Sequence, residues 1–146
     1  MIVFAIGVLF SWPSFTVGGL VLSPAWLGFA PVALWYLTRG DLALGVACTL
    51  AVGLLVLLAQ PLGRSGMASW LAWGAGLFAV GWAIQFAGHW YEGKKPAFVE
   101  DILGLIVAPL FITAEALFAL GWGKALLAEI ERRAGPTVLR DMAKIA

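Results

Sequence analysis

Three polar side chains share one face of a predicted helix in the middle of the chain. Gln85, His89 and Glu92 are spaced at i, i+4 and i+7, which places them within about 60° of one another on a helix. A histidine and a carboxylate three residues apart occur in the metal sites of helical bundles. Imidazole with carboxylate suits non-haem Fe(II), whose common site has two histidines, one carboxylate and open positions for O₂ and substrate. On spacing alone, however, the preferred interpretation is a polar cap of structural function.

Two further carboxylates lie close to this cluster in the sequence. Glu100 and Asp101 follow Pro96 and fall in the first turn of the next predicted helix. Negative charge at that position stabilises a helix N-terminus, which is the preferred interpretation of both residues. They are also expected to lie at the same end of the predicted bundle as His89, so either one could act as a carboxylate ligand.

Glu115 is a separate candidate, because it lies inside an apolar segment where a carboxylate is costly. It is about 21 Å along the helix from Asp101, so we do not expect it to share an ion with His89. It could meet Gln60 or Arg64 instead. A small proton-linked carrier that uses Glu115 is one functional hypothesis, and the lack of an inverted repeat counts against it.

The composition identifies the environment of these side chains. Of the 146 residues, 62% are hydrophobic and only 12% are charged, the net charge is +1, and the mean hydropathy is +0.97. Soluble domains average about 45–50% apolar and about 25% charged residues. The sequence therefore predicts an integral membrane protein and excludes disorder and nucleic-acid binding.

The apolar residues form continuous runs, which in lipid must be helices because backbone polar groups have to be satisfied internally. Five runs are visible: Met1–Phe10, Pro24–Leu37, Leu42–Ala59 (ended by Gln60 and Pro61), about Met67–Tyr91, and about Phe98–Trp122. We therefore predict an all-α membrane bundle of four to five transmembrane segments. The first run reaches only about 16 Å, about half of the hydrocarbon core. We interpret it as a truncated span whose natural start lies upstream of Met1.

The positions of the aromatic and basic residues agree with segments that cross the membrane in alternating directions. Trp and Tyr residues fall near the predicted ends of the segments, where membrane interfaces favour them, and only Trp82 falls in the middle of a span. The distribution of Lys and Arg places the C-terminal side in the cytoplasm. The predicted domains are a transmembrane bundle over residues 1–122 and an amphipathic cytoplasmic tail over residues 123–146. In the tail, Glu129 and Arg133 form an i, i+4 pair, and Gly135-Pro136 ends the helix.

The fourth run carries small residues at helical spacing. Ala75, Ala79, Ala83 and Ala87 repeat every four residues, and Gly74, Gly81 and Gly88 repeat every seven. Small residues let helix backbones approach closely in lipid. The preferred interpretation is packing within the bundle, and the alternative is a homodimer formed through this stripe.

Several of these segments together resemble the 2-hydroxy fatty acid dioxygenase family. The matching residues are Gln85-Phe86-Ala87-Gly88-His89-Trp90-Tyr91-Glu92, Lys95-Pro96-Ala97, Ala108-Pro109-Leu110-Phe111, Glu115 and Phe118. The resemblance implies Fe(II)-dependent α-oxidation of lipids, in which O₂ converts a 2-hydroxy acyl chain to an acid one carbon shorter. It also implies that His89 is an iron ligand and that Gln85, Glu92 and Glu115 are site or supporting residues. The spacing on the helix adds Glu92 as a second expected metal ligand, and the placement near His89 adds Asp101 and Glu100 as supporting residues.

In one respect this chain departs from the pattern of the family that it resembles. The family has a histidine-bearing segment before and at the start of its first helix, and this chain begins inside that helix. His89 is its one histidine, so a single protomer cannot supply two histidine ligands. The alternative to an enzyme is therefore a non-catalytic membrane protein that keeps the bundle but lacks a full metal site. The expected location is a bacterial inner membrane, or the endoplasmic reticulum in a eukaryote.

Overall fold

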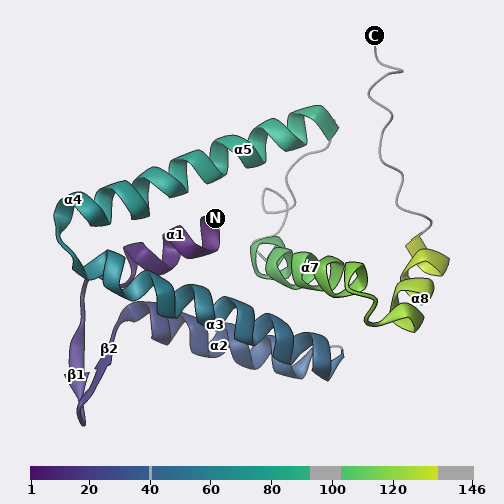
Figure 1. Ribbon diagram of the computed structural model, residues 1–146, viewed down its shortest axis with the longest axis horizontal. Coiled ribbons are helices and arrows are strands. Elements are labelled where there is room, and N and C mark those ends of the chain that lie inside the picture. The colour runs from purple at the N-terminus through teal and green to yellow at the C-terminus, as the bar shows by residue number, and fades with distance from the viewer. Residues whose placement is uncertain (40, 93–102, 135–146) are drawn as a thin grey trace.

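The chain folds almost entirely into helices, as the apolar runs predict (Figure 1). The computed structural model describes residues 1–39, 41–92 and 103–134. In chain order the elements are α1 (Ile2–Leu9), β1 (Phe15–Val17), β2 (Leu20–Leu22), α2 (Pro24–Thr38), α3 (Leu42–Arg64), α4 (Met67–Ser69), the π-helical segment η1 (Trp70–Gly76), α5 (Leu77–Glu92), α7 (Leu103–Ala119) and α8 (Lys124–Ala134). Glu100, Asp101 and the predicted break at Gly135-Pro136 lie outside the described residues.

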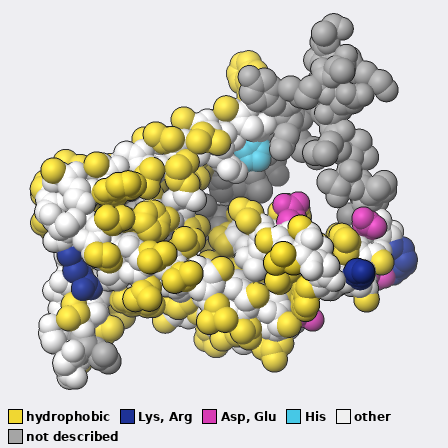
Figure 2. Space-filling view, viewed as in Figure 1, with side chains coloured by type: hydrophobic (Ala, Val, Ile, Leu, Met, Phe, Trp, Pro, Cys, Tyr) yellow, Lys and Arg dark blue, Asp and Glu magenta, His cyan; other side chains and the backbone are white. Residues whose placement is uncertain are grey.

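Two helical stretches are long and apolar enough to cross a membrane. They are Leu42–Arg64 and the continuous helix Met67–Trp90, and Ile106–Ala119 is a shorter apolar helix. The face of the molecule shown in Figure 2 is largely hydrophobic over these elements, and its charged side chains lie toward the ends. The helical fold class is thus confirmed, whereas the count of four to five spans stays a prediction.

Helix α3 is longer than predicted. We expected it to end at Gln60 and Pro61, but it continues through Pro61 to Arg64. A proline removes one backbone hydrogen bond, and apolar helices tolerate this where neighbouring groups satisfy the freed carbonyl. At its other end, the Asp41 carboxylate caps the helix by accepting a hydrogen bond of 3.0 Å from the Leu44 amide.

A two-stranded hairpin, which the all-helical prediction lacks, joins α1 to α2. Strands β1 and β2 pair antiparallel, with Phe15 opposite Leu22 and Val17 opposite Leu20. The turn between them is Gly18-Gly19, with φ values of 57° and 84°. Both values lie in the left-handed region that a tight two-residue hairpin turn requires, and glycine adopts it without a steric penalty.

Two glycines of the predicted stripe, Gly74 and Gly81, pack closely against α1. A Cβ on Gly74 would lie 2.7 Å from Leu9 Cδ2, and one on Gly81 would lie 2.7 Å from Ile2 Cγ1. These distances confirm close packing within the bundle at both glycines, because a larger residue would force the Leu9 or Ile2 side chain to shift. The alanines of the stripe are exposed, and a homodimer through them stays a prediction.

A buried polar network fixes the C-terminal end of α1. Gln60 on α3 accepts a hydrogen bond of 3.0 Å from the Ser23 hydroxyl and donates one of 2.9 Å to the Ser11 hydroxyl. Arg64 donates to the same Gln60 oxygen at 2.7 Å. The side chains of Ser11, Ser23 and Gln60 are buried, so each bond replaces contacts with water that folding removes. The network therefore ties α1, the start of α2 and α3 together.

Candidate functional site

Gln85 and His89 lie side by side on α5, as their spacing predicts. The Gln85 amide nitrogen is 3.0 Å from Nε2 of His89. The two side chains are therefore within hydrogen-bonding distance of each other, and the tautomer of the imidazole decides the role of Nε2. Gln85 is exposed and His89 is half-buried, which leaves the pair within reach of a ligand.

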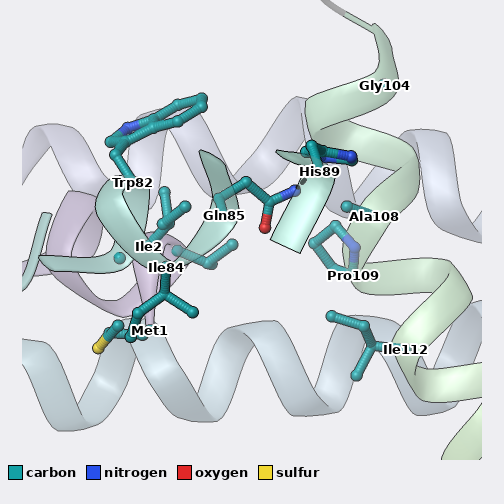
Figure 3. A pocket seen from close by; sticks show the side chains of 12 residues that line it. Met1, Ile2, Trp82, Ile84, Gln85, His89, Gly104, Ala108, Pro109 and Ile112 are labelled. Carbon is teal, nitrogen blue, oxygen red and sulfur yellow. Dashed lines mark hydrogen bonds between the residues drawn. The ribbon is translucent and has the colours of Figure 1, made fainter. Parts of the chain in front are cut away.

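These two side chains line a cavity of about 310 Å³. Its walls come from the N-terminal end of α1, from α5 and from α7, and Figure 3 shows Gln85 and His89 on one side with Pro109 and Ile112 of α7 facing them. The remaining walls are mainly apolar and include Met1, Ile2, Val3, Trp82, Ile84 and Ala108. A cavity with apolar walls and a few polar groups suits a ligand that has a hydrocarbon part and a polar head.

The carboxylates predicted to assist His89 fall into two groups. Glu92 ends α5 on the turn after His89, but the structure does not describe its side chain, and Glu100 and Asp101 lie outside the described residues. Glu115 is exposed on α7 and is not among the residues that line the cavity. The structure therefore brings Gln85 and His89 together, and the separation of Glu115 from the site of His89 stays a prediction.

Gln60 and Arg64, the suggested partners of Glu115, have other partners in the structure. Gln60 bonds to Ser11, Ser23 and Arg64, and no hydrogen bond or ion pair within the described ranges joins it or Arg64 to Glu115. Both atoms of the Gln60 amide group are thus engaged inside the bundle. Arg64 donates its hydrogen bond to the amide oxygen of Gln60.

The cavity walls are the part of the site that sequence reasoning missed. They come from three helices far apart in the chain, so no local motif could reveal them. Trp82 is the exception, because it is the one tryptophan that departs from the interfacial pattern. It lies three residues before Gln85 and lines the same cavity. A tryptophan in the middle of a span was the available signal.

The described residues do not by themselves complete a metal site. Within them, no three His, Cys, Asp or Glu side chains lie together in a way that could hold an ion. His89 supplies one imidazole, and Gln85 adds an amide oxygen as a weaker ligand. The common arrangement of two histidines and one carboxylate would need further ligands besides these.

Comparison with known proteins gives one family and one relative. Residues 2–120 match the family described as 2-hydroxy-palmitic acid dioxygenase Mpo1-like. The 2-hydroxy-palmitic acid dioxygenase MPO1 of Saccharomyces cerevisiae is 43% identical over 58 residues, which are 38% of this chain and 33% of the yeast protein. The aligned part thus spans one third of that relative. No solved structure matches the chain.

Proposed function

Because this chain belongs to the 2-hydroxy-palmitic acid dioxygenase Mpo1-like family, we propose that it is a membrane-embedded dioxygenase of 2-hydroxy fatty acids. The observation that carries the proposal is the pairing of Gln85 and His89 at the wall of an otherwise apolar cavity. A hydrocarbon chain between α1, α5 and α7 would leave its hydroxyl and carboxylate groups beside these two side chains. Membrane lipid is then both the surroundings and the source of the substrate.

The chemistry of such a substrate sets what the polar groups have to do. A 2-hydroxy acid and O₂ balance to an acid one carbon shorter, carbon dioxide and water, so no added reductant is needed. The bond between the first and second carbons breaks, and the second carbon becomes the new carboxyl group. Gln85 can bind the carboxylate or hydroxyl group of the substrate through its amide, and His89 lies beside it at the same wall of the cavity.

We also propose Fe(II) as the cofactor, with His89 and Glu92 as ligands. The support is the spacing of the two residues by three positions on one helix, together with membership of the family. Iron would supply the activation of O₂ that organic side chains cannot provide. Glu100 and Asp101, the other carboxylates expected near His89, lie outside the described residues.

The test is the iron content of the purified chain in detergent after anaerobic loading with Fe(II). We expect stoichiometric iron in the wild type and in Val80→Ala, an exposed α5 position outside the cavity. We expect its loss in His89→Ala, together with loss of O₂-dependent turnover of 2-hydroxypalmitic acid. Turnover that persists in His89→Ala would contradict the proposal. Absence of iron from the wild type would favour the alternative of a non-catalytic protein that keeps the bundle.

A further inference from the structure

A second cavity of about 160 Å³ lies between α2, α3 and α7. Ala25, Phe29 and Val32 of α2 form one wall, and Val52 and Val56 of α3 form another. Among the described residues that line it, Tyr36 alone carries a polar side-chain atom. Its hydroxyl donates a hydrogen bond of 2.8 Å to the Ile106 carbonyl oxygen. The polar atom is thus already satisfied by the protein, and the cavity offers a ligand only apolar surface.

This cavity adjoins the one that contains Gln85 and His89. Val3 of α1 and Pro109 of α7 line both cavities, so the two spaces lie against the same pair of side chains. Neither side chain carries a polar atom, and a proline ring has no N–H group to present. These two side chains therefore lie between the two spaces, and both present apolar surface to each of them.

We propose that the second cavity binds the methyl end of a long 2-hydroxy acyl chain, whose head lies at Gln85 and His89. The inference rests on the proposed function. The first cavity is at the small end of the range for ligand pockets, which is about 300–1,000 Å³. The second cavity adds space whose walls are apolar, like most walls of the first. Val3 and Pro109 form the passage between the two, and α2 sets the length of chain that fits.

Gly28 allows the second cavity to be filled without disturbing the fold. It lines the cavity on α2, and a Cβ built on it meets no atom within 4 Å. Gly28→Leu would place a branched side chain in this space. The matched control is Ala30→Leu, because Ala30 is exposed on the same helix and lines neither cavity.

The experiment uses two photoreactive 2-hydroxypalmitic acids with the purified full chain, without iron and without O₂. One carries a diazirine near the carboxyl group and the other carries it at the methyl end. We expect the first to label α5 and α7 around His89, and the second to label α2 around Phe29 and Val32. Because no turnover is needed, the result is independent of catalysis.

The outcomes separate this inference from the proposed function. Labelling near His89 by the first probe, with methyl-end labelling away from the second cavity, would overturn the inference and leave the proposed function standing. No labelling at either place would overturn both. In Gly28→Leu we expect methyl-end labelling of α2 to disappear. Binding of 2-hydroxypalmitic acid should weaken about tenfold, as for one side chain overlapping a filled site. Binding of 2-hydroxyoctanoic acid should stay unchanged, and Ala30→Leu should behave as wild type.

Discussion

The hydroxyl of Tyr36 donates a hydrogen bond of 2.8 Å to the carbonyl oxygen of Ile106. It joins the end of α2 to α7 at the turn before Pro109. Tyr36 is buried and packs with Cys48 and Val52 of α3, so three helices meet at this ring. Because α7 also forms one wall of the cavity at His89, the bond helps to set the position of that wall.

Tyr36→Phe removes this bond and keeps the ring. We expect the free energy of unfolding in detergent to fall by about 1 kcal/mol, the usual net value of one hydrogen bond. The control is Thr38→Val, because the Thr38 hydroxyl donates at 2.8 Å to the Leu34 carbonyl of its own helix and is exposed. If the two variants lose equal free energy of unfolding, the bond between α2 and α7 stabilises the fold no more than an exposed bond within one helix.

Gln60→Leu disrupts the buried network of Ser11, Ser23 and Arg64. The two hydroxyls and the guanidinium lose a shared partner inside the bundle, and we expect a cost of about 1–3 kcal/mol. The measurement is thermal unfolding of the purified chain. Ser65→Ala is the control, because the Ser65 hydroxyl makes an exposed bond to the Leu62 carbonyl. A Gln60→Leu protein as stable as the control would contradict a stabilising function for the network.

Gly45→Ala tests the contact between α2 and α3. A Cβ at Gly45 would overlap the carbonyl oxygen of Tyr36, and backbone cannot move aside as a flexible side chain can. We expect a loss of about 1–3 kcal/mol in unfolding free energy, as for other overpacked interiors. Gly88→Ala is the matched substitution, because its Cβ meets nothing within 4 Å. It should be neutral or slightly stabilising, since alanine favours helix more than glycine does.

Gln85→Ala removes the neighbour that orients His89. Groups that orient a functional imidazole typically contribute about 10–100-fold to metal affinity or activity. We expect turnover of 2-hydroxypalmitic acid to fall within that range while the unfolding temperature stays unchanged, because the side chain is exposed. Val80→Ala on the same helix should retain full turnover. A stable Gln85→Ala protein with wild-type turnover would show that the hydrogen bond to His89 is not used.

The pH dependence of α8 follows from Glu129, which forms ion pairs with two arginines of the same helix. Arg132 and Arg133 each bond to Glu129 at 2.6 Å, and they lower the pKa of its carboxyl group, Arg132 most. A lowered pKa in the folded state means that the stabilisation is full above the ordinary glutamate pKa. It is lost as the pH falls through the lowered value.

We therefore expect the helical circular dichroism of the chain to decrease in acid by a small amount that added salt reduces. Glu129→Gln should remove this part of the change, and Glu131→Gln should retain it. A salt-independent decrease in wild type would argue against the ion pairs as its cause.

The sequence predicts the helices well, because long apolar runs without the alternation of a strand favour helices. The boundaries of α2, the start of α8 and the pairing of Glu129 with Arg133 follow from local residues. So does the contact of Gln85 with His89, since both lie on one helix. The hairpin had its own signal in Gly18-Gly19 between two β-branched or aromatic segments. The prediction lacks the hairpin because each strand has only three residues and lies between two apolar runs.

The remaining features depend on contacts between distant segments. Pro61 lies inside α3, and the Gln60 side chain beside it turns inward to Ser11 and Ser23. Nothing near these residues in the sequence indicates that hydroxyl groups from the preceding loops will meet them. The π-helical turn of η1 likewise has no signal in its composition. The cavity at His89 is made by three helices, so its walls appear only once the bundle is assembled.

Helix α1 has different surroundings at its two ends. Its C-terminal end is held by Ser11 and Gln60, and its N-terminal residues line the cavity beside His89. The hydrogen bonds that hold the helix are therefore made at one end, and the side chains that line the cavity are at the other. A substitution at Ile2 or Val3 would change the shape of the cavity wall and leave the bonds between Ser11 and Gln60 in place.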